Sequence, residues 1–162
     1  MKGRSYTIRS IEPGDLQYLA DHLREADKAE LEAASGNRDF LSRLSMSVDL
    51  SEQVQVVEAD DVPVLLFGIA AMNDDTKAIW CVGTETMIRF RRALVEDADK
   101  IIAGWFEVHP MVQRLVNVTY TQNQAHHAWL RMLGAVIHPA EPMGPQGALF
   151  HPFEIKRETY DV

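Results

Sequence analysis

The sequence predicts a single α+β domain with a central mixed sheet that is mostly antiparallel and carries helices on both faces. The chain has 162 residues, of which 46% are apolar, so one domain spanning 1–162 can build a full core. Segments with strand-like apolar alternation interchange with segments of helical apolar spacing. One crossover, from a strand at 78–82 through a long helix to a strand at 114–120, predicts a parallel strand pair.

The amino-terminal third is expected to be a strand followed by two helices. Tyr6 and Ile8 mark the strand, which ends at Pro13-Gly14. Asp15 is placed to cap a long helix that Gly36-Asn37 ends. The apolar positions of this helix are Leu16, Leu19, Leu23 and Ala26. A second helix, over about 38–47, is expected to bury Phe40, Leu41 and Leu44.

The rest of the chain alternates strands and helices. Strands are expected at 54–57, 64–71, 78–82, 114–120, 136–137 and 149–155. Turns are expected at 60–63, 73–75 and 144–147, where Gly, Pro, Asn and Asp gather. A long helix spans about 88–108. Trp80, Trp105 and Trp129 lie on the apolar phase of their elements, so we expect all three to be largely buried.

Composition excludes several classes of protein. The formal net charge of −8 argues against direct nucleic-acid binding through phosphate contacts. The sequence has no apolar run of about 18 residues that would span a membrane, and its start, Met1-Lys-Gly-Arg-Ser-Tyr, lacks the apolar core of a signal peptide. Cys81 is the only cysteine, which excludes an internal disulfide and fits a reducing cytoplasm.

Cys81 has two interpretations. Its place between Trp80 and Val82 favours a buried, inert thiol on a strand. A nucleophilic role would require a nearby base, and the sequence does not place one.

The segment 116–134 has the clearest local pattern. Val116, Val118 and Tyr120 alternate as in a half-buried strand. Asn123 follows at the expected N-cap position of a helix. There its side-chain oxygen would accept a hydrogen bond from a backbone N–H two or three residues further along the chain. The helical apolar positions are Ala125, Trp129 and Leu133, and Gly134 supplies the left-handed position that ends the helix.

This strand–Asn–helix–Leu-Gly pattern resembles the last helix of the GNAT (Gcn5-related N-acetyltransferase) fold. In that family the asparagine starts a helix beside coenzyme A, and a Leu-Gly-Phe ending leads into the next strand; Ala135 replaces the Phe here. The resemblance implies the order β-α-α-β-β-β-α-β-α-β-β, which the strand and helix predictions support independently. It also implies that strands 78–82 and 114–120 splay apart beside a cleft for acetyl-CoA.

A narrower resemblance covers most of residues 6–155. In this range the sequence resembles a bacteriophage branch of the GNAT fold. That branch includes the small internal core protein of short-tailed coliphages and longer relatives that are often labelled acetyltransferases. This implies a location in the host bacterial cytoplasm, with packaging in the virion and contacts to virion proteins as one alternative. The residues that carry it are Leu23–Glu30, Trp80–Thr84, Asn123, His126, Trp129-Leu130, Leu133-Gly134, Gly144–Gly147 and Phe150–Glu154.

The GNAT resemblance places the pyrophosphate of acetyl-CoA at the turn after strand 78–82. Active enzymes carry Arg/Gln-x-x-Gly-x-Gly/Ala there, so that backbone N–H groups at a helix start can approach the phosphates. This chain has one glycine and an acidic Glu85 in that turn, so hydroxyls and guanidinium groups would have to compensate. The implied cofactor-binding residues are Val82, Gly83, Thr84, Arg89, Arg91, Arg92, Asn123 and Trp129. The alternative for the three arginines is a solvated helix face.

Catalysis would need a base for the amine and an acid for the departing thiolate. GNAT enzymes often use a tyrosine seven residues after the helix asparagine as the acid, but Leu130 occupies that position. His126 is the candidate acid, with a structural hydrogen-bonding role as the alternative. Glu30, with Asp27 beside it, is the candidate base or amine-binding group. The alternative is a solvated acidic face paired with Arg24 and Lys28.

Other chemistries find no support. No spacing of His126, His127, His138 and His151 matches a metal-ligand motif, so no metal is expected. No Gly-x-Ser-x-Gly elbow is present. Two functions from different classes remain. One is an acetyl-CoA-dependent N-acetyltransferase that modifies a small amine or a host protein. The other is a non-catalytic phage protein that reuses the fold for virion assembly or ejection.

Overall fold

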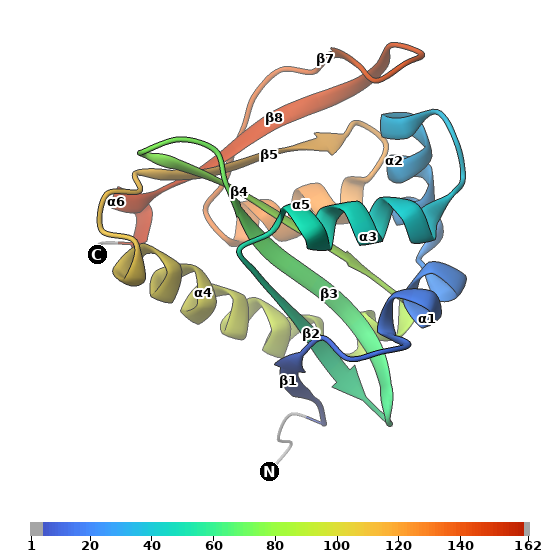
Figure 1. The fold of residues 1–162 in the computed structure, drawn as a ribbon. Helices are drawn as coiled ribbons and strands as arrows, with labels where there is room; N and C mark the ends of the chain where they lie inside the picture. The colour runs from blue at the N-terminus through green and yellow to red at the C-terminus, as the bar shows by residue number, and fades with distance from the viewer. Residues whose placement is uncertain (1–4, 161–162) are drawn as a thin grey trace.

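An eight-stranded sheet forms the centre of the computed structural model, which describes residues 5–160 (Figure 1). The segment 1–4, part of the start that lacks a signal-peptide core, and residues 161–162 lie outside the described residues. The strands are β1 (Thr7–Ser10), β2 (Gln53–Ala59), β3 (Val62–Ala71), β4 (Thr76–Gly83), β5 (Arg114–Tyr120), β6 (Val136–Ile137), β7 (Glu141–Met143) and β8 (Ala148–Lys156). The helices are α1 (Asp15–His22), α2 (Glu25–Ser35), α3 (Phe40–Leu50), the 3₁₀ helix η1 (Glu85–Phe90), α4 (Arg91–Val108), α5 (Gln124–Met132) and α6 (Arg157–Tyr160).

The strand order is β1-β2-β3-β4-β5-β8-β6, with β7 paired to β8. Every pairing is antiparallel except that of β4 with β5. The predicted fold class is therefore confirmed. Between residues 5 and 160, no helix combines the length and apolar character needed to cross a membrane.

The parallel pair β4–β5 opens toward its carboxyl ends. Pairing is limited to Thr76–Ala78 against Arg114–Val116, although β4 continues to Gly83 and β5 to Tyr120. The predicted parallel neighbours that splay apart are therefore confirmed. Just past the last pair, the Asn117 side-chain amide donates to the Ile79 carbonyl at 2.6 Å and bridges the start of the gap.

Helices cover both faces of the sheet (Figure 1). On one face, α4 and α5 bury the apolar side chains that alternate along β3, β4, β5 and β8. On the other face, α1 and α3 pack on β2, β3 and β4. Fully buried members include Ile69, Phe106, Leu115 and Ile155 on the first face, and Leu19, Leu44, Val56 and Leu66 on the second. The gap between β4 and β5 thus lies between two packed layers.

The expected single helix from Asp15 to about residue 35 is wrong, because the chain is extended at Leu23 and Arg24. Leu23 forms a β-bridge with Thr84, and the Arg24 N–H donates to the Gly83 carbonyl at 2.9 Å. Asp15 does not cap α1 either. Its buried carboxylate instead accepts the Glu12 N–H at 2.7 Å and pairs with Arg9 at 2.8 Å. Through these two contacts, the extended residues between α1 and α2 connect the amino-terminal helices to the end of β4.

The burial expected for the second helix needs correction. In α3 only Leu44 is buried, while Phe40 is half-buried and Leu41 is exposed, because the helix lays one narrow side on the sheet. The three tryptophans are largely buried, as expected, and each keeps a minor part of its surface accessible. Each lines a cavity on one side while packing against the core on the other.

Candidate active site at the splayed strands

Two cavities lie on either side of the opening between β4 and β5. We call the first, of about 250 Å³, the sheet cavity; residues from both faces of the sheet line it, among them Glu30, Ser47, Trp80 and Asn117. We call the second, of about 660 Å³, the arginine cleft; it lies between β4, α4 and α5 and is lined by Arg24, Arg91 and Arg92. The larger volume falls within the range of small-molecule and cofactor sites.

The two cavities meet at five shared residues, which come from β3, β4 and α5. These residues are Leu65, Cys81, Val82, His126 and Trp129. A molecule extending from one cavity into the other would pass His126 and Cys81. Val82, His126 and Trp129 are three of the residues that the sequence predicts for the site, and the fold brings them to this junction.

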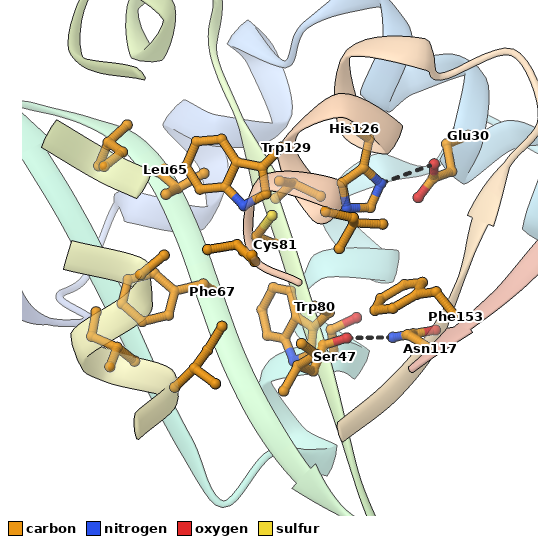
Figure 2. Close-up of a pocket in the computed structure, with 18 of the residues that line it drawn as sticks. Glu30, Ser47, Leu65, Phe67, Trp80, Cys81, Asn117, His126, Trp129 and Phe153 are labelled. Atoms are coloured by element: carbon orange, nitrogen blue, oxygen red, sulfur yellow. Dashed lines mark hydrogen bonds and ion pairs between the residues drawn. The ribbon is translucent and has the colours of Figure 1, made fainter. Parts of the chain in front are cut away.

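The predicted catalytic pair, Glu30 and His126, is brought together from α2 and α5 (Figure 2). His126 Nδ1 lies 3.0 Å from Thr119 Oγ1 and 3.8 Å from Glu30 Oε1. Burial disfavours a charged His126, but its contacts with Cys81 and Glu30 prevail and raise its pKa to about 10. The contacts of His126 therefore favour its imidazolium form, which can donate a proton.

Glu30 is held in place rather than solvated. Its carboxylate accepts the Tyr120 N–H at 3.0 Å and the Asn123 side-chain amide at 3.1 Å. Burial opposes the charged form, but the contact with His126 and these hydrogen bonds keep the pKa of Glu30 below its ordinary value. The alternative of a solvated acidic face holds in part. Arg24 pairs with Asp27 at 3.4 Å and Lys28 with Glu25 at 3.0 Å, as that alternative expected, but Asp27 is buried and Glu30 is bonded within the protein.

Asn123 lies at the start of α5 as predicted, but its side chain does not cap the helix. The amide Nδ2 donates to Glu30 at 3.1 Å and reaches Asp27 at 3.5 Å. Two carboxylates attract the N–H₂ end of the amide, because the oxygen end would be repelled there. Asn123 therefore joins α5 to α2 beneath the junction of the cavities.

We expect Asn123→Leu, which keeps a similar side-chain volume, to lower the free energy of unfolding by about 1–3 kcal/mol, because two buried carboxylates lose a donor. The folded pKa of Glu30 is lowered, so its contribution is present above its ordinary value of 4.5 and is lost as the pH falls through the lower folded value. The difference in free energy of unfolding between wild type and Asn123→Leu should therefore become smaller at acid pH. Urea denaturation at several pH values measures it. Gln124→Leu, at the exposed neighbouring amide, is the matched control; an equal loss in both variants would contradict this account.

The predicted phosphate turn has little free backbone to offer. The Gly83 N–H donates to Asp27 at 2.8 Å, and the Thr84 N–H donates to the Val64 carbonyl at 3.0 Å. A Cβ added to Gly83 would clash with Met87 Sδ, so this side chain already covers the glycine. In the predicted phosphate-binding backbone of residues 83–88, the first two N–H groups thus have internal partners. Burial raises the pKa of Asp27, the partner of Gly83.

The three predicted arginines separate into two groups. Arg91 and Arg92 line the arginine cleft. Arg89 is not among its lining residues; it pairs with Asp60 at 3.3 Å, where both side chains are exposed. Arg24, which sequence reasoning treated only as a partner of acidic residues, lines the cleft as well. The break between α1 and α2 brings Arg24 to the arginine cleft, and no pattern in the sequence predicts that break.

Unsatisfied polar atoms gather around this region. Within residues 5–160, the buried side-chain atoms without a hydrogen-bond partner are Arg24 Nε, Arg43 Nε, Thr84 Oγ1 and Asn123 Oδ1. Arg24 lines the arginine cleft, and Arg43 lines the sheet cavity. Thr84 follows Gly83 in the chain, and Asn123 contacts Glu30. Buried polar groups are normally hydrogen-bonded, so the guanidinium groups of Arg24 and Arg43 have hydrogen-bonding capacity left beside the two cavities.

The other histidines do not join the site. His127 bonds the Tyr120 carbonyl at 2.9 Å, and His138 pairs with Glu154 at 2.8 Å. Among the described residues, no group of three or more His, Cys, Asp or Glu side chains is placed to hold a metal ion. Leu130, at the position of the family's tyrosine, is buried in the core, and no tyrosine of the described chain lines either cavity.

Comparison with known proteins gives the fold. No protein-family model matches the sequence, and no curated protein sequence is significantly similar to it. Among solved structures, an acetyltransferase of the GNAT family from Bacillus anthracis superposes with a TM-score of 0.70 at 14% identity, covering 97% of this chain and 98% of that one. Spermidine N-acetyltransferase from Vibrio cholerae, solved with CoA and spermine, gives 0.65 at 17% identity and covers 96% and 98%. The chain therefore has the GNAT fold.

Proposed function

We propose that this protein is an acetyl-CoA-dependent N-acetyltransferase with an amine as acceptor. The observation that carries the proposal is the Glu30–His126 pair at the junction of two cavities, inside the opening between β4 and β5. Proton transfer needs a titratable group at a place that both substrates can reach, and His126 lines both cavities. The acceptor class agrees with the amine enzyme among the structural neighbours, which acts on spermidine.

Acetyl-CoA fits the arginine cleft through side chains more than through backbone. Arg24, Arg91 and Arg92 would hold its phosphates, since guanidinium groups pair well with phosphate oxygens. Gly83 and Thr84 have no free backbone N–H to give. When bound, acetyl-CoA supplies an acetyl group already activated as a thioester.

The chain's own groups divide the remaining tasks. His126, held as an imidazolium, donates a proton to the departing sulfur. Glu30 is a positioning residue: it fixes the imidazole from the Nδ1 side and favours its charged form. The acceptor amine would enter from the sheet cavity, where Trp80 and Asn117 line the approach. Glu30 also lines this cavity and would attract a cationic amine.

The cofactor arrangement predicts a clear difference between neighbouring arginines. Arg91→Ala combined with Arg92→Ala should weaken acetyl-CoA binding several-fold and reduce its salt dependence, because two charges that face the cleft are lost. Arg89→Ala removes the same charge outside the cleft and should leave the affinity close to wild type. Calorimetric titration at two salt concentrations measures both effects. Unchanged affinity in the double variant would place the phosphates elsewhere.

The occupied turn at Gly83 favours a second candidate function. Met87 and Asp27 fill the positions where backbone would approach phosphates, as expected of a GNAT fold that no longer binds a nucleotide. In that case the chain is a non-catalytic phage protein of virion assembly or ejection, as the narrower sequence resemblance implies. The absence of heat and of any rise in melting temperature with millimolar acetyl-CoA would favour this candidate over the enzyme.

A further inference from the structure

Cys81 occupies the position at which the two cavities meet. It is half-buried rather than buried, and it lines both cavities together with His126. Figure 2 shows the sulfur between His126 and Trp129, on the opposite side of the imidazole from Glu30. The fold thus places beside Cys81 a titratable histidine, which the sequence alone could not do.

We propose that Cys81 is a nucleophile that takes the acyl group from a thioester and passes it to the amine, with His126 as its proton partner and Glu30 as the residue that positions His126. The three side chains form the Cys–His–carboxylate sequence of an activated thiol. This inference rests on the proposed function for the identity of the acyl donor. The reactivity of Cys81 itself rests on the geometry alone.

The two steps balance. In the first, the Cys81 thiolate attacks the thioester carbonyl, a new C–S bond forms at Cys81, the C–S bond of the donor breaks, and the His126 imidazolium protonates the departing thiolate. In the second, the neutral amine attacks the acyl-cysteine, its excess proton passes to the now neutral His126, and the Cys81 thiolate leaves. Cys81 and His126 thus return to the protonation state in which they began, and no oxidant or reductant is needed.

The two-step route resolves a shortage of proton carriers. Direct transfer needs a base for the amine and an acid for the thiolate at the same time. Of the residues shared by the two cavities, only His126 and Cys81 can exchange protons, and a charged His126 cannot act as a base. When the acyl group stops at Cys81, His126 serves first as the acid and then as the base.

The test begins without an amine. The full chain is incubated with acetyl-CoA and, separately, with a small acetyl thioester that lacks the nucleotide, S-acetyl-N-acetylcysteamine. Intact-mass measurement and peptide mapping should find one acetyl group, on Cys81, and the group should be lost on addition of an amine. Cys81→Ala should show no label, and His126→Gln should acquire it about 10²–10⁴ times more slowly.

The two donors separate this inference from the proposed function. Labelling of Cys81 by the small thioester alone would support the nucleophile while removing acetyl-CoA as the donor. Acetyl transfer to an amine at an undiminished rate in Cys81→Ala would overturn the inference and leave the acetyltransferase standing. Failure of both donors to label Cys81 would also overturn it. Cys81→Ser, which keeps the size of the side chain, guards against a folding defect in the alanine variant, and alkylation of Cys81 by iodoacetamide should slow in His126→Gln.

Discussion

Replacing His126 with alanine should lower the rate of acetyl transfer by about 10²–10⁴, which is the usual contribution of a positioned acid or base. His126 is the one histidine that lines either cavity among the described residues, and no tyrosine there can substitute for it. Steady-state rates with acetyl-CoA and a panel of amines measure the loss. The effect should fall mainly on kcat, because the imidazolium acts on the departing thiolate.

The pH profile gives the same group a second signature. Since the pKa of His126 is raised to about 10, its acid form persists through neutral pH and is lost as the pH rises toward that value. The wild-type rate should therefore decline on the alkaline side, and the decline should be absent in His126→Ala. His127→Gln is the matched control on the same helix, because His127 lines neither cavity. Equal losses in the two variants would assign His126 a structural role.

Local patterns were sufficient to predict the framework of the fold. The alternation along β5, the glycine after α5 and the crossover from β4 to β5 depend on neighbours in sequence, and they predict the parallel pair correctly. The break at Leu23–Arg24 could not be predicted in this way. Helical spacing continues through it, and only the bridge from Leu23 to Thr84, sixty-one positions away by their numbers, makes the chain extended there.

In the site, too, local patterns predict single residues but not the contacts between distant segments. His126 and Glu30 were chosen by residue type and family position, and the fold places them 3.8 Å apart. Their meeting with Cys81 requires α2, β4 and α5 to converge, which no local pattern reveals. Asn123 was assigned to the start of the correct helix but with the wrong partner. A capping asparagine and one that bonds distant carboxylates look alike in the sequence.

The three tryptophans illustrate a third limit. Apolar phase predicts which side of an element faces inward, but not whether that side meets packed atoms or a cavity. Trp80 and Trp105 each direct the indole N–H to a polar partner, Ser51 and Gln53, at 2.8 and 3.1 Å. Such indoles lie at the border of the core, where a large apolar ring and a polar tip are both accommodated.

Trp129→Ala should cost the most stability of the variants considered, about 3 kcal/mol. Its indole packs against both apolar clusters on the α4–α5 face and also lines both cavities. Truncation of a buried tryptophan usually costs about 3–5 kcal/mol, and the partial exposure of Trp129 beside the cavities favours the lower end of that range. Chemical denaturation, read by circular dichroism so that loss of the indole does not affect the signal, measures the difference.

Met132→Ala is the matched control on the same helix, because Met132 is 63% exposed and should change the free energy of unfolding by less than about 0.5 kcal/mol.

Trp129→Phe separates stability from function. The phenyl ring retains most of the contact with the core, so the variant should stay folded, but the wall shared by the two cavities recedes beside Cys81 and His126. Since a misplacement of about 1 Å can cost on the order of 10²-fold in rate, activity should fall further than stability in this variant. Loss of both in proportion would mean that Trp129 serves only the core.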